Sequence, residues 1–257
     1  MNGQIEKADQ FRALHIPGKP LVLFNVWDAG SARAVAGAGA KAIATGSWSV
    51  AHANGFEDGE QTPLDLATEN LRRIVSVTQL PVSIDLEGGY GATVDRVGNT
   101  VRLAIEGGAV GCNLEDSIPG SGELRALVDQ AGRIQSARRT AEDAEINFFI
   151  NARTDVFFGQ SAARHDNAMI LEAVERAYAY AEAGADGLFV PGLADLALIA
   201  RLVEASPLPI NIMLGDFTSP LSAFAEQGVA RISFGPRPYL LAMKVLEGAA
   251  REAHLGC

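Results

Sequence analysis

Cysteine and lysine are both scarce in this chain. Only two cysteines occur, Cys112 within an apolar segment and Cys257 at the last position, so neither a disulfide framework nor a thiolate metal site is expected. The four histidines are scattered without a pair at ligand spacing, which argues against a zinc site of the usual kind. Both cysteines are therefore interpreted as having no functional role.

Long apolar runs and a basic surface are also missing. No apolar segment reaches the roughly 20 residues of a membrane helix, and the first residues lack the basic and apolar regions of a secretory signal. A net charge of -10 argues against a surface built for nucleic acid or anionic lipid. We expect a cytoplasmic protein that binds neither nucleic acids nor membranes.

What is present is apolar material in a regular pattern. The 257 residues are 48% hydrophobic, enough for one large core, and no linker or change of composition marks a boundary. Strand-like runs alternate with helical runs eight times. The expected strands cover residues 21–27, 42–48, 82–87, 111–115, 147–154, 187–190, 210–214 and 231–235. This alternation predicts a single domain over residues 1–257 with the closed (β/α)8 barrel fold, the TIM barrel.

Two local patterns refine this prediction. A doubly wound open sheet would place a nucleotide-type glycine-rich turn after the first strand, and the sequence DAGS at 28–31 is not such a turn. Thr62 followed by Pro63 and Asp65 has the spacing of a capping box, so a helix is expected to begin there with Thr62 as its cap.

Polar residues gather at the carboxyl ends of the expected strands, where barrel enzymes hold their active sites. Asp85 and Glu87 lie two apart in a strand and therefore share one face. The same alternation puts Asn113 and Glu115 on the inner face of the next strand and Cys112 toward the helices. Neighbouring carboxylates repel each other, so a divalent cation or a shared proton is expected there; a solvated turn with two unrelated acids is the alternative.

The types of side chain narrow the chemistry. Asp85, Glu87 and Glu115, with Asp58 in the loop after the second strand, offer oxygen ligands that suit Mg²⁺ or Mn²⁺ rather than zinc. Arg153 offers a fork for a substrate carboxylate, and the amides and hydroxyls of residues 47–49 could hold an oxyanion. Together these groups suit a 2-oxo acid chelated by magnesium.

The positions of the lysines separate two routes to an enolate. Either a metal or a lysine Schiff base can stabilise an enolate. Lys7 and Lys19 precede the first strand, Lys41 stands at the wrong end of the second, and Lys244 lies in the last helix. No lysine is placed to form an imine, which favours the metal. The segment 116–124, rich in Gly, Ser and Pro, is either a lid over the substrate or a plain surface loop.

Four short motifs, in order and at their spacing, resemble the isocitrate lyase / phosphoenolpyruvate mutase superfamily, specifically its phosphonomutase-like branch. The motifs are VWDAGSAR at 26–33, DLEGGYG at 85–91, NLED at 113–116 and NARTD at 151–155. The resemblance implies a (β/α)8 barrel, often with the last helix exchanged between the subunits of a homodimer or homotetramer. It also implies an enzyme that binds a 2-oxo acid or its enolate with Mg²⁺, and that breaks or forms C–C bonds or rearranges or hydrolyses P–C bonds.

The resemblance also implies roles for individual residues. Asp85 matches the direct magnesium ligand, and the carboxylates that hold the water ligands of the metal match Asp58, Glu87 and Glu115. Asp58, Glu115 and Arg153 are the candidate catalytic residues. The candidate substrate-binding residues surround the expected barrel mouth and are Ser47, Trp48, Ser49, Asn113, Arg153 and Asn211.

Departures from the family pattern decide between its reactions. Isocitrate and methylisocitrate lyases carry a catalytic cysteine in the lid, where this chain has no cysteine, lysine or histidine. Phosphonate enzymes of the family have a lid lysine and a histidine after the sixth strand, where this chain has Val190 and Pro191.

We therefore expect a magnesium-dependent lyase that acts on a small 2-oxo acid by C–C cleavage or decarboxylation through an enolate. A phosphonomutase or P–C hydrolase is the alternative, and it would need a cation such as Arg125 or Arg237 in the site. A non-catalytic protein that binds oxo acids is the third hypothesis.

Overall fold

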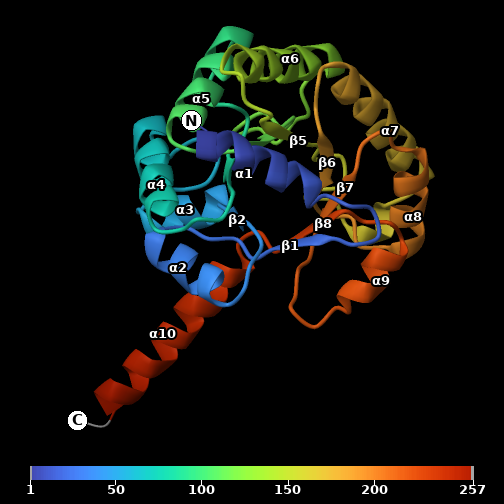
Figure 1. Ribbon diagram of the computed structural model, residues 1–257. Coiled ribbons are helices and arrows are strands. Elements are labelled where there is room, and N and C mark those ends of the chain that lie inside the picture. Colours follow the sequence, from blue (N-terminus) through green and yellow to red (C-terminus); the bar gives the residue numbers. More distant parts are fainter. Residues whose placement is uncertain (1, 256–257) are drawn as a thin grey trace.

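Eight parallel strands form the centre of the molecule in the computed structural model, which describes residues 2–255, and helices surround them (Figure 1). The strands pair in the order β1-β8-β7-β6-β5-β4-β3-β2, and a parallel bridge between Val26 and Thr45 brings the two outer strands together. This near-closed arrangement confirms the predicted barrel. The strands are β1 (Leu21–Leu23), β2 (Ile43–Ala44), β3 (Val82–Asp85), β4 (Gly111–Glu115), β5 (Phe149–Arg153), β6 (Gly187–Val190), β7 (Ile210–Met213) and β8 (Arg231–Ser233).

Helices follow the strands around the barrel, because their apolar faces cover the outward side chains of the sheet. They are α1 (Asn2–Ala13), α2 (Ala29–Gly37), α3 (Ser47–Ala53), α4 (Leu64–Ser76), α5 (Val94–Glu106), α6 (Leu127–Asp143), α7 (Asn167–Glu182), α8 (Leu196–Ala205), α9 (Leu221–Glu226) and α10 (Arg237–Leu255), with a 3-10 turn at Ala162–Arg164. Among residues 2–255, none of these helices combines the length and apolarity needed to cross a bilayer.

Two local predictions were wrong. The second strand ends at Ala44 rather than residue 48, because Val50 N–H bonds to the Gly46 carbonyl and the chain turns into α3. Thr62 does not cap α4: the capping position is Pro63, no side chain caps the helix, and the Thr62 hydroxyl is buried without a partner. The Thr-Pro-x-Asp spacing is therefore shifted by one residue from the helix start that the chain adopts.

Helix α1 closes the amino end of the barrel, where it lies across the ring of strands (Figure 1). Asp186, just before β6, accepts hydrogen bonds from Arg12 (2.6 Å), from Arg138 (2.5 Å) and from the Ile150 amide (2.8 Å). His15 stacks on Phe149, with ring centroids 4.0 Å apart. Asp186 and its two arginines therefore form a group of ion pairs at this end of the barrel.

Helix α10 departs from the barrel and projects away from it (Figure 1). It carries exposed apolar side chains at Leu240, Leu241, Val245 and Leu246. An open apolar groove of about 730 Å³ lies where α1, β1 and α2 meet. Val22 of β1 lines this groove and is 38% exposed, although it belongs to a barrel strand. One outer face of the barrel is thus left without a helix.

Candidate active site

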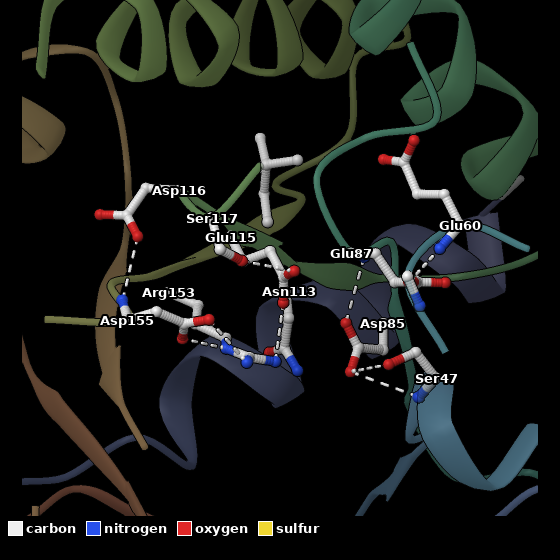
Figure 2. A network of polar contacts seen from close by, with 12 residues as sticks. Ser47, Glu60, Asp85, Glu87, Asn113, Glu115, Asp116, Ser117, Arg153 and Asp155 are labelled. Carbon is white, nitrogen blue, oxygen red and sulfur yellow. Dashed lines mark hydrogen bonds and ion pairs between the residues drawn. The ribbon is translucent and has the colours of Figure 1, made fainter. Parts of the chain in front are cut away.

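Asp85 ends β3 and faces the barrel mouth (Figure 2). Its Oδ2 accepts from the amide and hydroxyl of Ser47, at 3.4 and 3.3 Å, and its Oδ1 accepts from the Glu87 amide at 3.3 Å. Ser47 reaches Asp85 because the chain enters α3 directly after β2. The amides and the hydroxyl that contact Asp85 carry no net charge. Within residues 2–255, no Lys or Arg side chain forms an ion pair with Asp85.

Glu87 ties the loop that carries Asp58 to the end of β3. Its Oε2 accepts from the amides of Gly59 (2.9 Å) and Glu60 (2.5 Å), and the Tyr90 hydroxyl donates to its Oε1 (3.0 Å). Glu60 in turn accepts from the Tyr90 amide at 2.8 Å. Glu60, Glu87 and Tyr90 all have φ between 49° and 61°, a conformation that costs non-glycine residues roughly 1–3 kcal/mol each. Backbone strain is therefore concentrated around this carboxylate.

Burial is the main cause of the raised pKa values in this cluster, and the charges of neighbouring acids add to it. Burial raises the pKa of Glu87 to about 7, with further contributions from the charges of Asp58 and Asp85. Asp58 stands at the rim of the cavity, and its partial burial together with the Asp85 charge raises its pKa as well. Burial and like charge both oppose ionisation of these acids, and a bound cation would favour it. Among residues 2–255, Asp58, Asp85 and Glu87 form no ion pair with a Lys or Arg side chain.

Arg153 at the end of β5 is held between two carboxylates (Figure 2). Its Nη1 lies 2.7 Å from Glu115 of β4, and its Nε and Nη2 donate to the two oxygens of Asp155 at 2.6 and 2.9 Å. Ser117 donates to the second oxygen of Glu115 at 2.8 Å. Burial raises the pKa of Glu115, and the neighbouring Arg153 charge opposes that shift.

A second layer of contacts fixes Asp155 and the base of the predicted lid. The fully buried Asp116 accepts from the Asp155 amide (2.9 Å), from Tyr180 (2.8 Å) and from Arg176 (3.2 Å). The Arg125 amide donates to the Asp116 carbonyl at 2.7 Å, which closes the segment between them. The segment is therefore a loop with a fixed base, and the same contacts orient the carboxylate that grips the arginine of the site.

Two of the predicted substrate-binding residues lie away from the cavity. Asn211 is buried inside the barrel, where its amide donates to the carbonyls of Ile212 and Arg231 and its oxygen accepts from Asn151. Ser49 is buried on α3. Neither side chain is among those that line the cavity at the barrel mouth.

The other predicted residues converge on this cavity or stand directly behind it. A cavity of about 130 Å³ is lined by Asn25, Gly46, Ser47, Trp48, Asp58, Asp85, Asn113, Arg153, Phe158, Phe189, Met213, Ser233, Gly235 and Pro236. Glu87 and Glu115 contact the loop and the arginine beside it. Sequence reasoning missed Glu60, Tyr90 and Asp155. The last two lie within recognised motifs, and Asp155 has the same strand parity as Arg153.

The donor set fits a hydrated divalent ion. Within residues 2–255 no three His, Cys, Asp or Glu side chains come close enough to enclose a metal by themselves. Magnesium keeps several waters and needs only one or two carboxylates, and Asp58, Asp85 and Glu87 are oxygen donors that form no ion pair within residues 2–255. Asp85 would be the direct ligand, with Asp58, Glu87 and Glu115 placed around it for the waters.

Comparison with known proteins gives consistent matches over nearly the whole chain. Residues 11–254 match the family described as phosphoenolpyruvate phosphomutase. The 2-methylisocitrate lyase of Escherichia coli K12 is 30% identical, over 94% of this chain and 84% of the relative. An oxaloacetate decarboxylase of Pseudomonas savastanoi pv. phaseolicola is 29% identical, over 94% and 83%.

Solved structures give the same picture. A Burkholderia cenocepacia J2315 protein, provisionally named a phosphonomutase, is 56% identical with a TM-score of 0.95, over 97% of this chain and 99% of that one. A phosphonopyruvate hydrolase, crystallised with oxalate and Mg²⁺, is 22% identical with a TM-score of 0.82, over 97% and 88%, which shows a shared fold.

Proposed function

Because the chain belongs to the phosphoenolpyruvate mutase and isocitrate lyase superfamily of enzymes, we propose that it is a magnesium-dependent lyase acting on a small 2-oxo acid. The reaction would be C–C cleavage or decarboxylation through an enolate. The observation that carries the proposal is that Asp58 and Asp85, which form no ion pair within residues 2–255, line a small cavity together with Arg153.

Each group in the site would have a separate role in the reaction. When bound, Mg²⁺ would supply Lewis acidity at the oxo group, where the negative charge of an enolate develops. Ser47 and the start of α3 lie beside Asp85 and would hold the substrate carboxylate and oxo oxygen. Two N–H bonds of the Arg153 guanidinium remain beyond its three contacts and would donate to substrate from the facing strand. Asp58, at the rim with a raised pKa, is placed to hold and return a proton.

The relatives support this class of reaction. A 2-methylisocitrate lyase and an oxaloacetate decarboxylase both break a C–C bond, and the phosphonopyruvate hydrolase binds oxalate with Mg²⁺ in a barrel of the same fold. A 2-oxo acid has a carboxylate next to an oxo group, and the oxygens of both can bind a hydrated cation. This ligand chemistry matches the polar side of the cavity.

A screen of substrates tests the proposal. The purified protein is incubated with oxaloacetate, 2-methylisocitrate, isocitrate, phosphonopyruvate and further 2-oxo acids, with Mg²⁺ or with EDTA. We expect Mg²⁺-dependent release of pyruvate from at least one carbon substrate. Magnesium-dependent binding without any product would instead favour a non-catalytic oxo-acid-binding protein.

P–C chemistry is the alternative that the provisional name of the Burkholderia protein favours. It requires positive charge for the phosphonyl group, and the two arginines considered for this role do not line the cavity. Arg125 lies 3.7 Å from Asp129, and the exposed Arg237 donates to the Gly215 carbonyl. Phosphate released from phosphonopyruvate would establish this alternative and overturn the proposal.

We also propose that the protein is a homo-oligomer in which α10 of a second copy fills the apolar groove between α1, β1 and α2. The groove is open, and α10 exposes a row of apolar side chains far from its own barrel. Light scattering after gel filtration should give a dimer or tetramer. Val245→Lys should shift it toward monomer, and Lys244→Glu, an adjacent charge change, should not. A monomeric parent protein would contradict the proposal.

A further inference from the structure

The cavity at the barrel mouth has two unlike sides. Ser47, Asp58 and Asp85 belong to the elements after β2 and to β3. Phe189 of β6 and Met213 of β7 lie on the other side, because these strands stand four positions away in the ring of eight. A ligand whose polar head contacts the first side therefore points its other end at the second.

The second side has no net positive charge, although Arg153 lies there against Phe158 and Phe189. Arg153 is the sole cationic side chain among the described residues that line the cavity. Its guanidinium already contacts Glu115 and both oxygens of Asp155. One arginine between two carboxylates leaves no net positive charge for a second anionic group at the far end.

Phe158 completes the apolar side and is held there by the backbone. Its amide donates to the Asp155 carbonyl at 3.0 Å, and the preceding Phe157 is fully buried. Gly192 lies so close to this turn that a Cβ atom would come within 2.6 Å of the Phe157 carbonyl oxygen. Phe158 is 47% exposed, and its ring covers the Arg153 guanidinium, whose central carbon lies 4.9 Å from the ring centroid. A fixed, exposed aromatic ring at the mouth of a cavity is suited to an apolar ligand group.

We propose that the substrate carries a short apolar substituent where the substrates of the curated lyase relatives carry a second acidic group. This inference rests on the proposed function, whose 2-oxo acid supplies the polar head. The cavity of about 130 Å³ is well below the roughly 300–1,000 Å³ of pockets for larger ligands, so the substituent is short. Trp48 and Pro236 add to the apolar lining.

An apolar substituent on the substrate also favours C–C cleavage over decarboxylation. Decarboxylation through an enolate needs a second carboxylate, whereas a 4-hydroxy-2-oxo acid with an alkyl group on C4 needs none. In that substrate the C4 hydroxyl gives its proton to a base, the C3–C4 bond breaks, and its electron pair forms the enolate of pyruvate. A proton then adds to C3, so that pyruvate and an aldehyde are released with no change of oxidation state overall. Asp58, which lines the cavity, is the group placed to take and return this proton.

The first test compares matched ligands by calorimetry in the presence of Mg²⁺. We expect 2-oxopentanoate to bind about 10-fold more tightly than 2-oxoglutarate, which has the same chain length and a second carboxylate. Phe158→Arg should reverse this preference, and Tyr178→Arg, at an exposed aromatic on α7 outside the cavity, should leave it unchanged. Tighter binding of 2-oxoglutarate by the parent protein would overturn the inference while leaving the proposed function intact.

The second test compares turnover. With Mg²⁺, pyruvate should form about 10-fold faster from 4-hydroxy-2-oxopentanoate than from 4-hydroxy-2-oxoglutarate, which carries a carboxylate in place of the C4 methyl group. Faster cleavage of the carboxylated substrate would overturn the inference alone. Absence of binding by every 2-oxo acid would overturn the proposed function, and the inference with it.

Discussion

Two aspartates at opposite ends of the barrel show how one residue type serves two purposes. Asp186, at the amino end, is surrounded by Arg12, Arg138 and a backbone amide. Asp85, at the carboxyl end, is surrounded by Ser47, a backbone amide and other acids. The Asp186 carboxylate has its positively charged partners within the protein, so it stabilises the fold without a ligand. The Asp85 carboxylate leaves an unfavourable charge that a bound cation would neutralise, which is how a binding site differs from a structural ion pair.

Backbone conformation also differs between the two ends of the barrel. Three non-glycine residues with positive φ gather around Glu87 at the barrel mouth. At the amino end the corresponding conformation occurs at Glu145, which follows α6 and lies on the surface. Strain around Glu87 is held by hydrogen bonds to its carboxylate, whereas strain at Glu145 has no such contacts with a site. Four tests ask whether these differences between the two ends of the barrel are functional.

The largest effect is expected at Asp85. Asp85→Asn keeps the shape of the side chain and removes its charge, so Mg²⁺-dependent turnover should fall at least ~100-fold and Mg²⁺-dependent oxalate binding should be lost. The free energy of unfolding should stay constant or rise, because one of the mutually repelling acids is gone. Asp143→Asn, at an exposed acid ending α6, is the matched control. Full activity of the Asp85 variant would refute the assigned role.

At Asp186 we expect a loss of stability without a change in KM. Asp186→Asn leaves Arg12 and Arg138 without their carboxylate and should lower the free energy of unfolding by about 2–3 kcal/mol. Urea titration measures this loss. Because Asp186 is remote from the mouth, KM below the unfolding transition should match that of the parent. A variant as stable as the parent would show that the amino end does not depend on this pair.

An effect that is smaller for each pH unit is expected from a change of pH. The pKa of Glu87 is about 7 in the folded protein against 4.5 ordinarily, so between these values the folded state holds a proton that the unfolded state has released. Stability of the metal-free protein should therefore decrease as pH rises from about 5 to 7, by up to about 1.4 kcal/mol per pH unit for this group. Glu87→Gln should remove that contribution, and added Mg²⁺ should stabilise the parent more at pH 8 than at pH 6. An unchanged slope in the variant would contradict this assignment.

The smallest effect concerns backbone strain. Glu145→Gly should raise the free energy of unfolding by up to about 1 kcal/mol without affecting turnover, because glycine adopts positive φ at no steric cost. Glu60→Gly relieves similar strain but removes the acceptor for the Tyr90 amide, and it should lower kcat/KM roughly 10-fold. Equal activity in both variants would mean that strain at the mouth has no functional role.

The sequence was sufficient for the barrel and for the surroundings of Asp85. Strand alternation in a barrel puts every second residue inward, so Asp85 could be placed on one face with Glu87, and Asn113 with Glu115. Family motifs then supplied their expected roles, which stay predictions. Asn211 obeyed the same alternation and still lies below the cavity, because alternation gives the face of a strand and not the depth along the barrel axis.

Features that depend on packing between distant segments could not be predicted in this way. The early end of β2 depends on where α3 begins, and the capping of α4 depends on a shift of one residue at Pro63. The contact of Gly192 with the Phe157 turn joins two loops far apart in the sequence. The apolar half of the cavity is built from such contacts, and residues like Phe189 and Met213 read as ordinary core residues in the sequence.

Cys112 provides a way to time the opening of the barrel. Its side chain is fully buried on β4, and burial raises the pKa of its thiol, so reaction with a disulfide reagent requires the strand to separate from its neighbours. In a Cys257→Ser background the labelling rate would report how often the sheet opens under native conditions. A ligand that tightens the mouth should slow this chemistry, which gives an assay for substrates that needs no knowledge of the product.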